Sequence, residues 1–335
     1  MIRKVLLGFA LLLVVCAAAY VRMRHKRAAL EIGYAGNKQV TLVSTTALVR
    51  EPVATVNYGD RLEILQRYQD QVQVRTMKGV TGWINERDLL TTDLWQKARD
   101  LETRADGMAV MARGHTRAIT NLHIGPGRES PRLRQLSKTI PVEMYERTTI
   151  AVPAPKVVKS SEQEEGGAEP AQEKMEDWWL VRAHAADQNA ISGWVLGRFV
   201  QLDVPSPLPD YASTAGMRIV SWFELNRVND SAGKAKPQFL VLGTHGPEGQ
   251  PCDFSMMRVY TWGNQRQRYE TAFVESNVCG KLPVNVTKAE AAGGDVTFTF
   301  GDMSGKAAGE RTYRMHQTIV RRVREGGKTP ARKPH

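Results

Sequence analysis

One pattern of alternating apolar and polar residues occurs twice in the chain. The first copy runs through 72–75 (VQVR), a turn, 82–84 (GWI) and 89–90 (LL). The second runs through 179–182 (WLVR), a longer turn, 193–195 (GWV) and 199–202 (FVQL). Apolar residues at every second position are typical of a strand with one buried face. Each copy therefore predicts a β-hairpin, and the repetition predicts a duplicated fold.

A glycine directly precedes a tryptophan in both copies, at Gly82-Trp83 and Gly193-Trp194. Glycine at such a position indicates a close approach of backbone or a positive φ. The indole supplies the large apolar area that a small core needs. These four residues are therefore predicted to be structural, with both rings in the core.

The segments upstream of each Gly-Trp pair extend the pattern. In the first copy, 47–52 (ALVREP) is followed by 59–65 (GDRLEIL), and in the second, 121–127 (NLHIGPG) is followed by 139–145 (TIPVEMY). Together these segments resemble the opening turn and next strand of bacterial SH3 (SH3b) domains, over about 40–90 and 114–203. The resemblance implies two SH3-like small barrels in tandem and a role at the cell envelope.

The N-terminus holds an apolar run at 5–21, flanked by basic residues on both sides. A helix of this length spans about 25 Å, near the minimum for a bilayer core. We expect residues 1–27 to be a transmembrane anchor, giving a single-pass inner-membrane protein with its domains facing the periplasm. Two alternatives stay open: a signal cleaved near Ala17-Ala18-Ala19, and a lipoprotein signal at Cys16.

The formal charge of +11 is confined to the two ends of the chain. Residues 1–27 contain six basic and no acidic residues, and residues 321–335 contain six basic residues and one acidic residue. The region between them is formally neutral, so a basic face for nucleic acid is not expected. The seven histidines show no spacing typical of a zinc site, and we expect no cofactor or metal.

The remaining sequence divides by composition. The expected class is mainly β, with a C-terminal antiparallel domain that resembles no family we can name. A Ser/Glu/Gly-rich tract should be disordered, because it cannot bury enough apolar area to offset its ordering entropy. The expected parts begin with a spacer at 28–38, barrel 1 at 39–90, a connecting helix at 91–107 and barrel 2 at 114–203 with a disordered insertion at 150–176. A Pro-rich linker at 204–210, a β-rich domain at 211–323 and a disordered basic tail at 324–335 follow. The last segment of the β-rich domain, 315–324, could instead be helical.

Cys252 and Cys279 share the C-terminal domain, and either a disulfide or packed thiols would suit them. SH3b repeats often precede a cysteine peptidase domain, which makes these residues candidate nucleophiles with His245 or His316 as base. The surroundings of both cysteines depart from the family's D-C-S-G helix start. We therefore expect no catalytic residue and a protein that is not an enzyme.

Four residues are candidate ligand contacts. If Trp179 is buried, the adjacent Trp178 should face outward, and Tyr68 lies in a predicted loop. Exposed aromatic rings near Arg147 or Arg182 would suit a cell-wall glycan, a peptide or an envelope protein. The sequence thus predicts a membrane-tethered envelope binding or scaffold protein. The alternative is a peptidoglycan-processing cysteine hydrolase with its site in the C-terminal domain, and the oligomeric state stays open.

Overall fold

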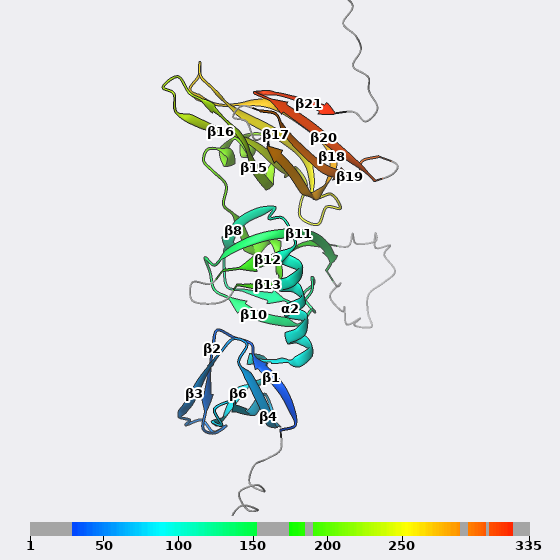
Figure 1. The fold of residues 1–335 in the computed structure, drawn as a ribbon. Coiled ribbons are helices and arrows are strands. Elements are labelled where there is room, and N and C mark those ends of the chain that lie inside the picture. Colours follow the sequence, from blue (N-terminus) through cyan, green and yellow to red (C-terminus); the bar gives the residue numbers. More distant parts are fainter. Residues whose placement is uncertain (1–28, 153–173, 185–189, 289–293, 306–307, 324–335) are drawn as a thin grey trace, which may run out of the picture. The chain divides into compact units, whose positions relative to one another are not determined.

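The computed structural model describes residues 29–152, 174–184, 190–288, 294–305 and 308–323. The chain divides into two compact units, Met1–Lys97 and Ala98–His335. Its described part is mainly β, with three antiparallel sheets of seven strands each (Figure 1). The predicted mainly β, antiparallel class is therefore confirmed.

The first sheet belongs to the first unit. Its strands are β1 (Glu31–Ala35), β2 (Gln39–Val43), β3 (Pro52–Asn57), β4 (Arg61–Tyr68), β5 (Gln71–Thr76), β6 (Thr81–Asn85) and β7 (Leu89–Thr91), with the 3₁₀ turn η1 (Glu86–Asp88) before β7. They are ordered β3-β2-β6-β5-β4-β1-β7. Alternate residues of these strands, such as Leu62, Ile64, Val72 and Val74, form a fully buried cluster on one face.

The second sheet repeats this arrangement in the second unit. Its strands are β8 (Ala112–Thr116), β9 (Thr120–His123), β10 (Arg132–Leu136), β11 (Pro141–Ala151), β12 (Met175–Ala183), β13 (Ile191–Leu196) and β14 (Val200–Leu202), with η2 (Gly197–Phe199) before β14. Their order, β10-β9-β13-β12-β11-β8-β14, is that of the first sheet with every number raised by seven. The register shift after Ile64 in β4 recurs after Met144 in β11.

The two Gly-Trp pairs occupy equivalent positions in these sheets. A Cβ on Gly82 would lie 2.8 Å from Leu42 Cβ, and a Cβ on Gly193 would lie 2.6 Å from Leu122 Cγ. Both glycines thus allow the strand that carries the tryptophan to pass close to its neighbour. Close approach, rather than positive φ, is the reason for glycine at both positions.

The helix α2 (Thr92–Asp106) follows the first sheet. Thr91 caps its start, since its hydroxyl accepts a hydrogen bond from the Leu94 amide at 3.2 Å. In the first turn Trp95 stacks on Tyr34 with ring centroids 4.9 Å apart. Ala98 and Ala105, on a later part of the helix, are buried.

The third sheet is a simple antiparallel meander in the second unit. Its strands, in spatial and chain order, are β15 (Arg218–Asn229), β16 (Ala235–Thr244), β17 (Phe254–Gly263), β18 (Arg268–Lys288), β19 (Val296–Asp302), β20 (Gly309–His316) and β21 (Ile319–Val323). One face carries a cluster that includes Leu240 and Phe298. The other face, with Phe239 and Val241, is packed against the short helix α3 (Leu208–Thr214).

Several predicted boundaries are corrected. The spacer at 28–38 contains β1, which pairs with β4 and β7. The insertion at 150–176 is shorter, because β11 continues to Ala151 and β12 begins at Met175. The linker at 204–210 includes the start of α3. The last segment of the third sheet forms strands, as its main prediction stated, and not the alternative helix.

The predicted anchor at 1–27, residues 153–173 of the insertion and the tail at 324–335 lie outside the described residues. Among the helices that the structure does describe, none has the length and apolar character needed to span a membrane.

Candidate functional site

A buried ion cluster joins the second sheet to the third within the second unit. Arg147, on β11, donates from Nη2 to Asp177 Oδ1 at 2.7 Å and from Nη1 to Asp253 Oδ1 at 2.9 Å. All three side chains are at most 4% exposed. Arg147 also donates to the backbone carbonyls of Gln250 and Cys252. Both terminal nitrogens of the guanidinium are therefore engaged by protein acceptors, so Arg147 is held in a structural cluster.

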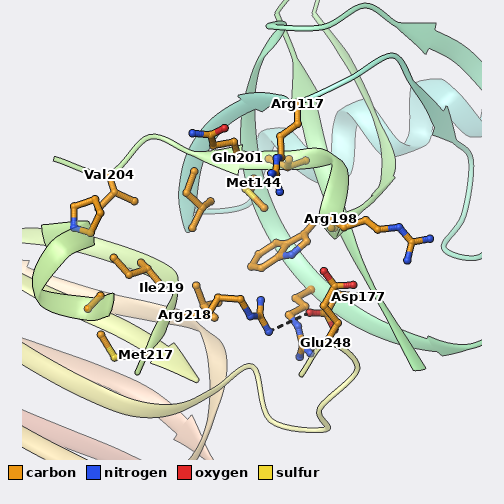
Figure 2. A pocket seen from close by; sticks show the side chains of 18 of the residues that line it. Arg117, Met144, Asp177, Arg198, Gln201, Val204, Met217, Arg218, Ile219 and Glu248 are labelled. Atoms are coloured by element: carbon orange, nitrogen blue, oxygen red, sulfur yellow. Dashed lines mark hydrogen bonds and ion pairs between the residues drawn. The ribbon is translucent and has the colours of Figure 1, made fainter. Parts of the chain in front are cut away.

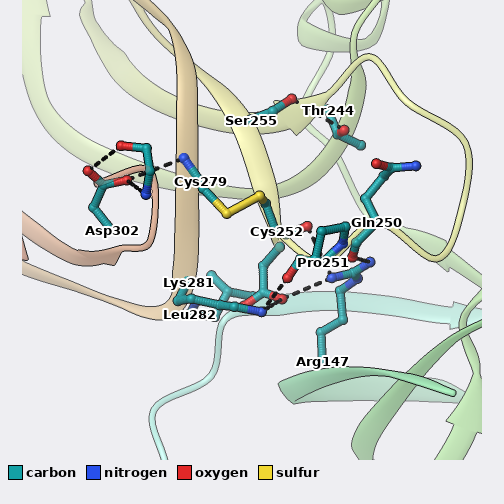
Figure 3. The surroundings of a disulfide bond; sticks show 12 residues. Arg147, Thr244, Gln250, Pro251, Cys252, Ser255, Cys279, Lys281, Leu282 and Asp302 are labelled. Carbon is teal, nitrogen blue, oxygen red and sulfur yellow. Dashed lines mark hydrogen bonds and ion pairs between the residues drawn. A yellow bond between two sulfur atoms is a disulfide. The ribbon is translucent and has the colours of Figure 1, made fainter. Parts of the chain in front are cut away.

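The loop between β16 and β17 is held from several directions. Cys252, at its end, is bonded to Cys279 of β18 in a disulfide (Figure 3). Asp253 accepts hydrogen bonds from the Leu282 amide at 2.9 Å and from Lys281 Nζ at 3.4 Å. The amide of Gly249 donates to Asp177 at 2.7 Å. The disulfide and the ion cluster thus fix the same loop.

A cavity of about 680 Å³ lies beside this loop, between the second and third sheets (Figure 2). Its volume falls in the range of small-molecule sites. The charged side chains that line it are Arg117, Arg147, Asp177, Arg198, Arg218 and Glu248. Its apolar lining includes Trp179 and Met144 of the second sheet, and Val204, Ala212 and Met217 from the segment that leads into the third.

Two arginines reach into the cavity without strong protein partners (Figure 2). Within the described part of the chain, the guanidinium of Arg117 makes no hydrogen bond or ion pair. Arg218 lies 3.8 Å from Asp177 Oδ2, and its side chain is 46% exposed. By contrast, the buried Asp177 is already bonded to Arg147. Arg117 therefore gives the cavity an unpaired cationic group within the described part of the chain, and Arg218 gives it a second one that is held only by a long ion pair.

A third arginine of the cavity is engaged elsewhere. Arg198 donates to Glu176 Oε1 at 2.8 Å, and Arg128 binds the same carboxylate through Nε at 2.9 Å and Nη2 at 2.5 Å. The hydrogen bond from Arg128, aided by Arg198, holds the pKa of the buried Glu176 below its ordinary value. Arg198 is thus fixed at the edge of the cavity.

Trp178 lines a second, smaller cavity of about 310 Å³, together with His123, Arg128 and Phe199. The prediction that Trp178 faces outward is wrong, because its ring is only 2% exposed. Trp179, on the opposite face of β12, is also buried, at 5%. Both faces of this strand are covered.

The outer face of the second sheet differs from its counterpart in the first. Trp178, Leu180, Trp194 and Leu196 form one apolar cluster, covered by Leu101 of α2 and by Met108, Ile150 and Phe199. At equivalent register positions the first sheet has Gln71, Gln73, Trp83 and Asn85. The apolar residues at these positions of the second sheet, together with the residues that cover them, explain why Trp178 is buried.

Trp83 and Trp194 are buried, at 9% and 4% exposure, which agrees with a structural role. Ile84, next to Trp83, belongs to the buried cluster of the first sheet, and Trp83 does not. Since adjacent strand residues face opposite sides, both tryptophans lie on the outer faces. Trp194 packs there with Trp178, so the two rings have unlike surroundings.

Neither of the other two predicted contacts lines the cavity. Arg182 donates to Asp106 at 2.6 Å and to the Glu102 carbonyl at 3.0 Å, which ties α2 to the second sheet. Tyr68 is 52% exposed, as expected, but lies at the end of β4 in the first unit. Of the four predicted contacts, Arg147 alone lines this cavity.

The predicted catalytic alternative meets a chemical obstacle. Both candidate sulfur atoms are bonded to each other, so neither is a thiolate. His245 is hydrogen-bonded to the Gly216 carbonyl and His316 to Asp295, each at 2.8 Å. Among the described residues, no group of three or more His, Cys, Asp or Glu could hold a metal ion.

Comparison with known proteins gives only distant structural likenesses. No family model matches the chain, and no curated protein does. NlpC1 from Trichomonas vaginalis is 10% identical with a TM-score of 0.18, over 57% of this chain and 54% of its own. An NlpC/P60 family protein from Bacillus cereus is 12% identical with a TM-score of 0.21, over 59% and 65%. NlpC2 from Trichomonas vaginalis is 11% identical with a TM-score of 0.17, over 89% and 92%.

The first two matches span less than two thirds of the similar proteins' own length. The expectation that this chain is not an enzyme is corrected by the comparison, because its structural neighbours are NlpC and NlpC/P60 proteins, a cysteine peptidase family. At such TM-scores the likeness assigns no reaction and no catalytic residue to this chain.

Sequence reasoning missed the arginines of the cavity. Arg117, Arg198 and Arg218 lie in three separate segments, and each is an ordinary surface residue in its local pattern. They share a cavity because the third sheet packs against the second, which no local motif reveals. The apolar outer face of β12 and β13 is a signal in the sequence that this face is covered. The residues that cover it are Leu101, Met108, Ile150 and Phe199.

Proposed function

We propose that the protein is an envelope binding protein whose second unit takes a cell-wall component, or a segment of an envelope protein, in the arginine-lined cavity. The observation that carries this proposal is the cavity of about 680 Å³, which has an apolar lining and two arginines, Arg117 and Arg218, without strong protein partners. A concave site of this size with a few polar groups is the usual form of a ligand site.

The two repeated sheets support an assignment to the SH3b type. They share strand order, the position of the register shift and the glycine before the tryptophan. Folds of this kind serve many ligands, so the repetition supports the type of module and not the ligand.

The disulfide between Cys252 and Cys279 supports a location outside the cytoplasm, because disulfides persist in oxidising compartments. With the apolar run at 5–21, it fits a protein held at the inner membrane with its domains in the periplasm. Cell fractionation and the intact mass of the purified protein test this placement and separate an anchor from a cleaved or lipidated N-terminus.

Co-sedimentation with purified peptidoglycan sacculi, and capture of cross-linked envelope proteins, test the binding function. We expect the full chain to bind one of these partners, and a variant with Arg117→Gln and Arg218→Gln to bind it at least about tenfold more weakly. Arg266→Gln is the matched control, because Arg266 is an exposed arginine of the third sheet. Equal binding by all three proteins would contradict the proposal.

The same preparations test wall processing. Release of soluble fragments from sacculi is measured with and without reductant, because both cysteines of the described residues are held in the disulfide. Release that requires reduction and is lost in Cys252→Ser or Cys279→Ser would add a catalytic role to the binding function.

A further inference from the structure

We infer that the cavity selects ligands with an acidic group, a carboxylate or a phosphate, joined to an apolar portion. The inference rests on the proposed function in one respect, that the cavity is a binding site. It adds the chemical class of the ligand and the residues that recognise it.

The charges around the cavity favour an acidic ligand. Three buried carboxylates lie near it, and each has an arginine partner: Asp177 and Asp253 share Arg147, and Glu176 is paired with Arg128 and Arg198. Lys281 adds a further positive charge at 3.4 Å from Asp253. These three buried acids therefore have partners without Arg117, and Arg218 makes only a long ion pair, at 3.8 Å from Asp177.

Arg117 and Arg218 enter the cavity from different elements. Arg117 directly follows β8 of the second sheet, and Arg218 begins β15 of the third. Figure 2 shows both side chains reaching into the space between the sheets. A guanidinium presents planar, paired donors that match carboxylate and phosphate oxygens, so these two residues are suited to an acidic group.

The acid Glu248 also lines the cavity, from the loop between β16 and β17. In the described part of the chain it makes no ion pair. Its negative charge opposes the entry of an anion, so its effect on affinity must be opposite in sign to that of the arginines. This opposition provides a sharp internal control.

The apolar lining of the cavity favours a ligand with an apolar portion. Met144, Trp179, Val204 and Met217 contribute hydrocarbon or aromatic surface beside the arginines. A small inorganic anion would leave this surface unused, whereas an acidic ligand with an apolar portion would cover it and gain from its burial. The cavity therefore favours an amphipathic acid over a free ion.

Isothermal titration of the full chain tests the inference with four probes. These are acetyl-Val-Ala with a free carboxylate, the same peptide as its C-terminal amide, phenyl phosphate and inorganic phosphate. We expect acetyl-Val-Ala, phenyl phosphate or both to bind. The peptide acid should then bind at least about tenfold more tightly than its amide, and phenyl phosphate at least about tenfold more tightly than inorganic phosphate. Which one binds identifies the acidic group.

Four variants complete the experiment. Arg117→Gln and Arg218→Gln should each weaken binding of the acidic probe about tenfold, whereas Glu248→Gln should leave it unchanged or tighten it. Arg266→Gln should have no effect. Circular dichroism of each variant establishes that it is folded.

Three results would overturn the inference: no binding of either amphipathic acid, equal binding of the acid and its amide, or unchanged affinity in both arginine variants. Its failure is distinguishable from failure of the proposed function. The variants Arg117→Gln and Arg218→Gln could weaken binding to sacculi or to an envelope protein while the probes show no preference for acids. That result would support the cavity as the binding site and reject the acidic class of ligand.

Discussion

The guanidinium of Arg147 and the carboxylate of Asp253 meet at 2.9 Å in a contact that is almost completely buried. The two residues are 106 positions apart: Arg147 lies on β11 of the second sheet, and Asp253 directly precedes β17 of the third. Because Arg147 also bonds Asp177, one guanidinium is shared by two buried acids. The contact therefore fixes how the two sheets of the second unit enclose the cavity.

Replacing Arg147 should destabilise the second unit strongly. Arg147→Met leaves Asp177 and Asp253 buried without their main partner, and we expect a loss of about 3–5 kcal/mol in the free energy of unfolding. Urea-induced unfolding measures it. The matched control is Arg67→Met, at the equivalent register position of the first sheet, where Arg67 bonds the half-exposed Glu31 and Glu86.

That control should lose only about 0–1 kcal/mol, because solvent screens exposed ion pairs. Similar losses in the two variants would show that the Arg147 cluster has no special role in holding the sheets.

Opening the disulfide should lower stability by an amount set by its loop. Cys252 and Cys279 are 27 residues apart, and closing a loop of that length restricts the unfolded chain by about 3–4 kcal/mol. The double variant Cys252→Ser with Cys279→Ser should show this loss in urea-induced unfolding, and reductant should then have no further effect. A variant as stable as the oxidised protein would contradict the expectation.

The close strand approach at Gly193 predicts intolerance of a methyl group. In Gly193→Ala the new Cβ would meet Leu122 Cγ at 2.6 Å and the His123 carbonyl oxygen at 2.8 Å. We expect a loss of about 1–3 kcal/mol from the forced shift, measured as a lower midpoint of thermal unfolding. Gly309→Ala is the control, because a Cβ there meets no atom within 4 Å and its midpoint should not fall.

The lowered pKa of Glu176 predicts a component of acid sensitivity. A carboxylate with a folded-state pKa below its unfolded value contributes stability that is complete above about pH 4.3. This contribution is lost as the pH falls through the folded-state pKa. In Glu176→Gln the fall in stability below that pH should be shallower than in the original protein, as urea-induced unfolding at a series of pH values will show.

The control for this prediction is Glu310→Gln, which removes an exposed carboxylate from β20. It should leave the pH dependence unchanged. An equally steep fall in the Glu176 variant would mean that the bonds from Arg128 and Arg198 do not matter to acid stability.

Local alternation was enough to predict the strands around Gly82 and Gly193 and the mainly β class. The helix expected at 91–107 corresponds to α2 at Thr92–Asp106, because its apolar spacing and its Thr cap are local signals. β1 was not predicted, because it has only five residues and Gly33 interrupts their apolar pattern. Its place in the sheet depends on pairing with β4, which lies about thirty residues further along.

The functional residues were harder to predict because their roles depend on contacts between sheets. Arg147 and Arg67 occupy equivalent register positions, yet Arg147 is buried and Arg67 is 39% exposed. What separates them is the third sheet, which packs on the second and supplies Asp253. Trp178 was expected to be exposed because period-two reasoning assumes one solvent face, and a second covering layer removes that assumption.

The most direct test of the cavity as the binding site is amide hydrogen exchange of the full chain with and without solubilised peptidoglycan fragments or the captured envelope protein. The account predicts slower exchange in the segments that line the cavity, around Arg117, at 197–204 and at 212–220. Protection confined to the first unit, or bound ligand with unchanged exchange in all three segments, would contradict it.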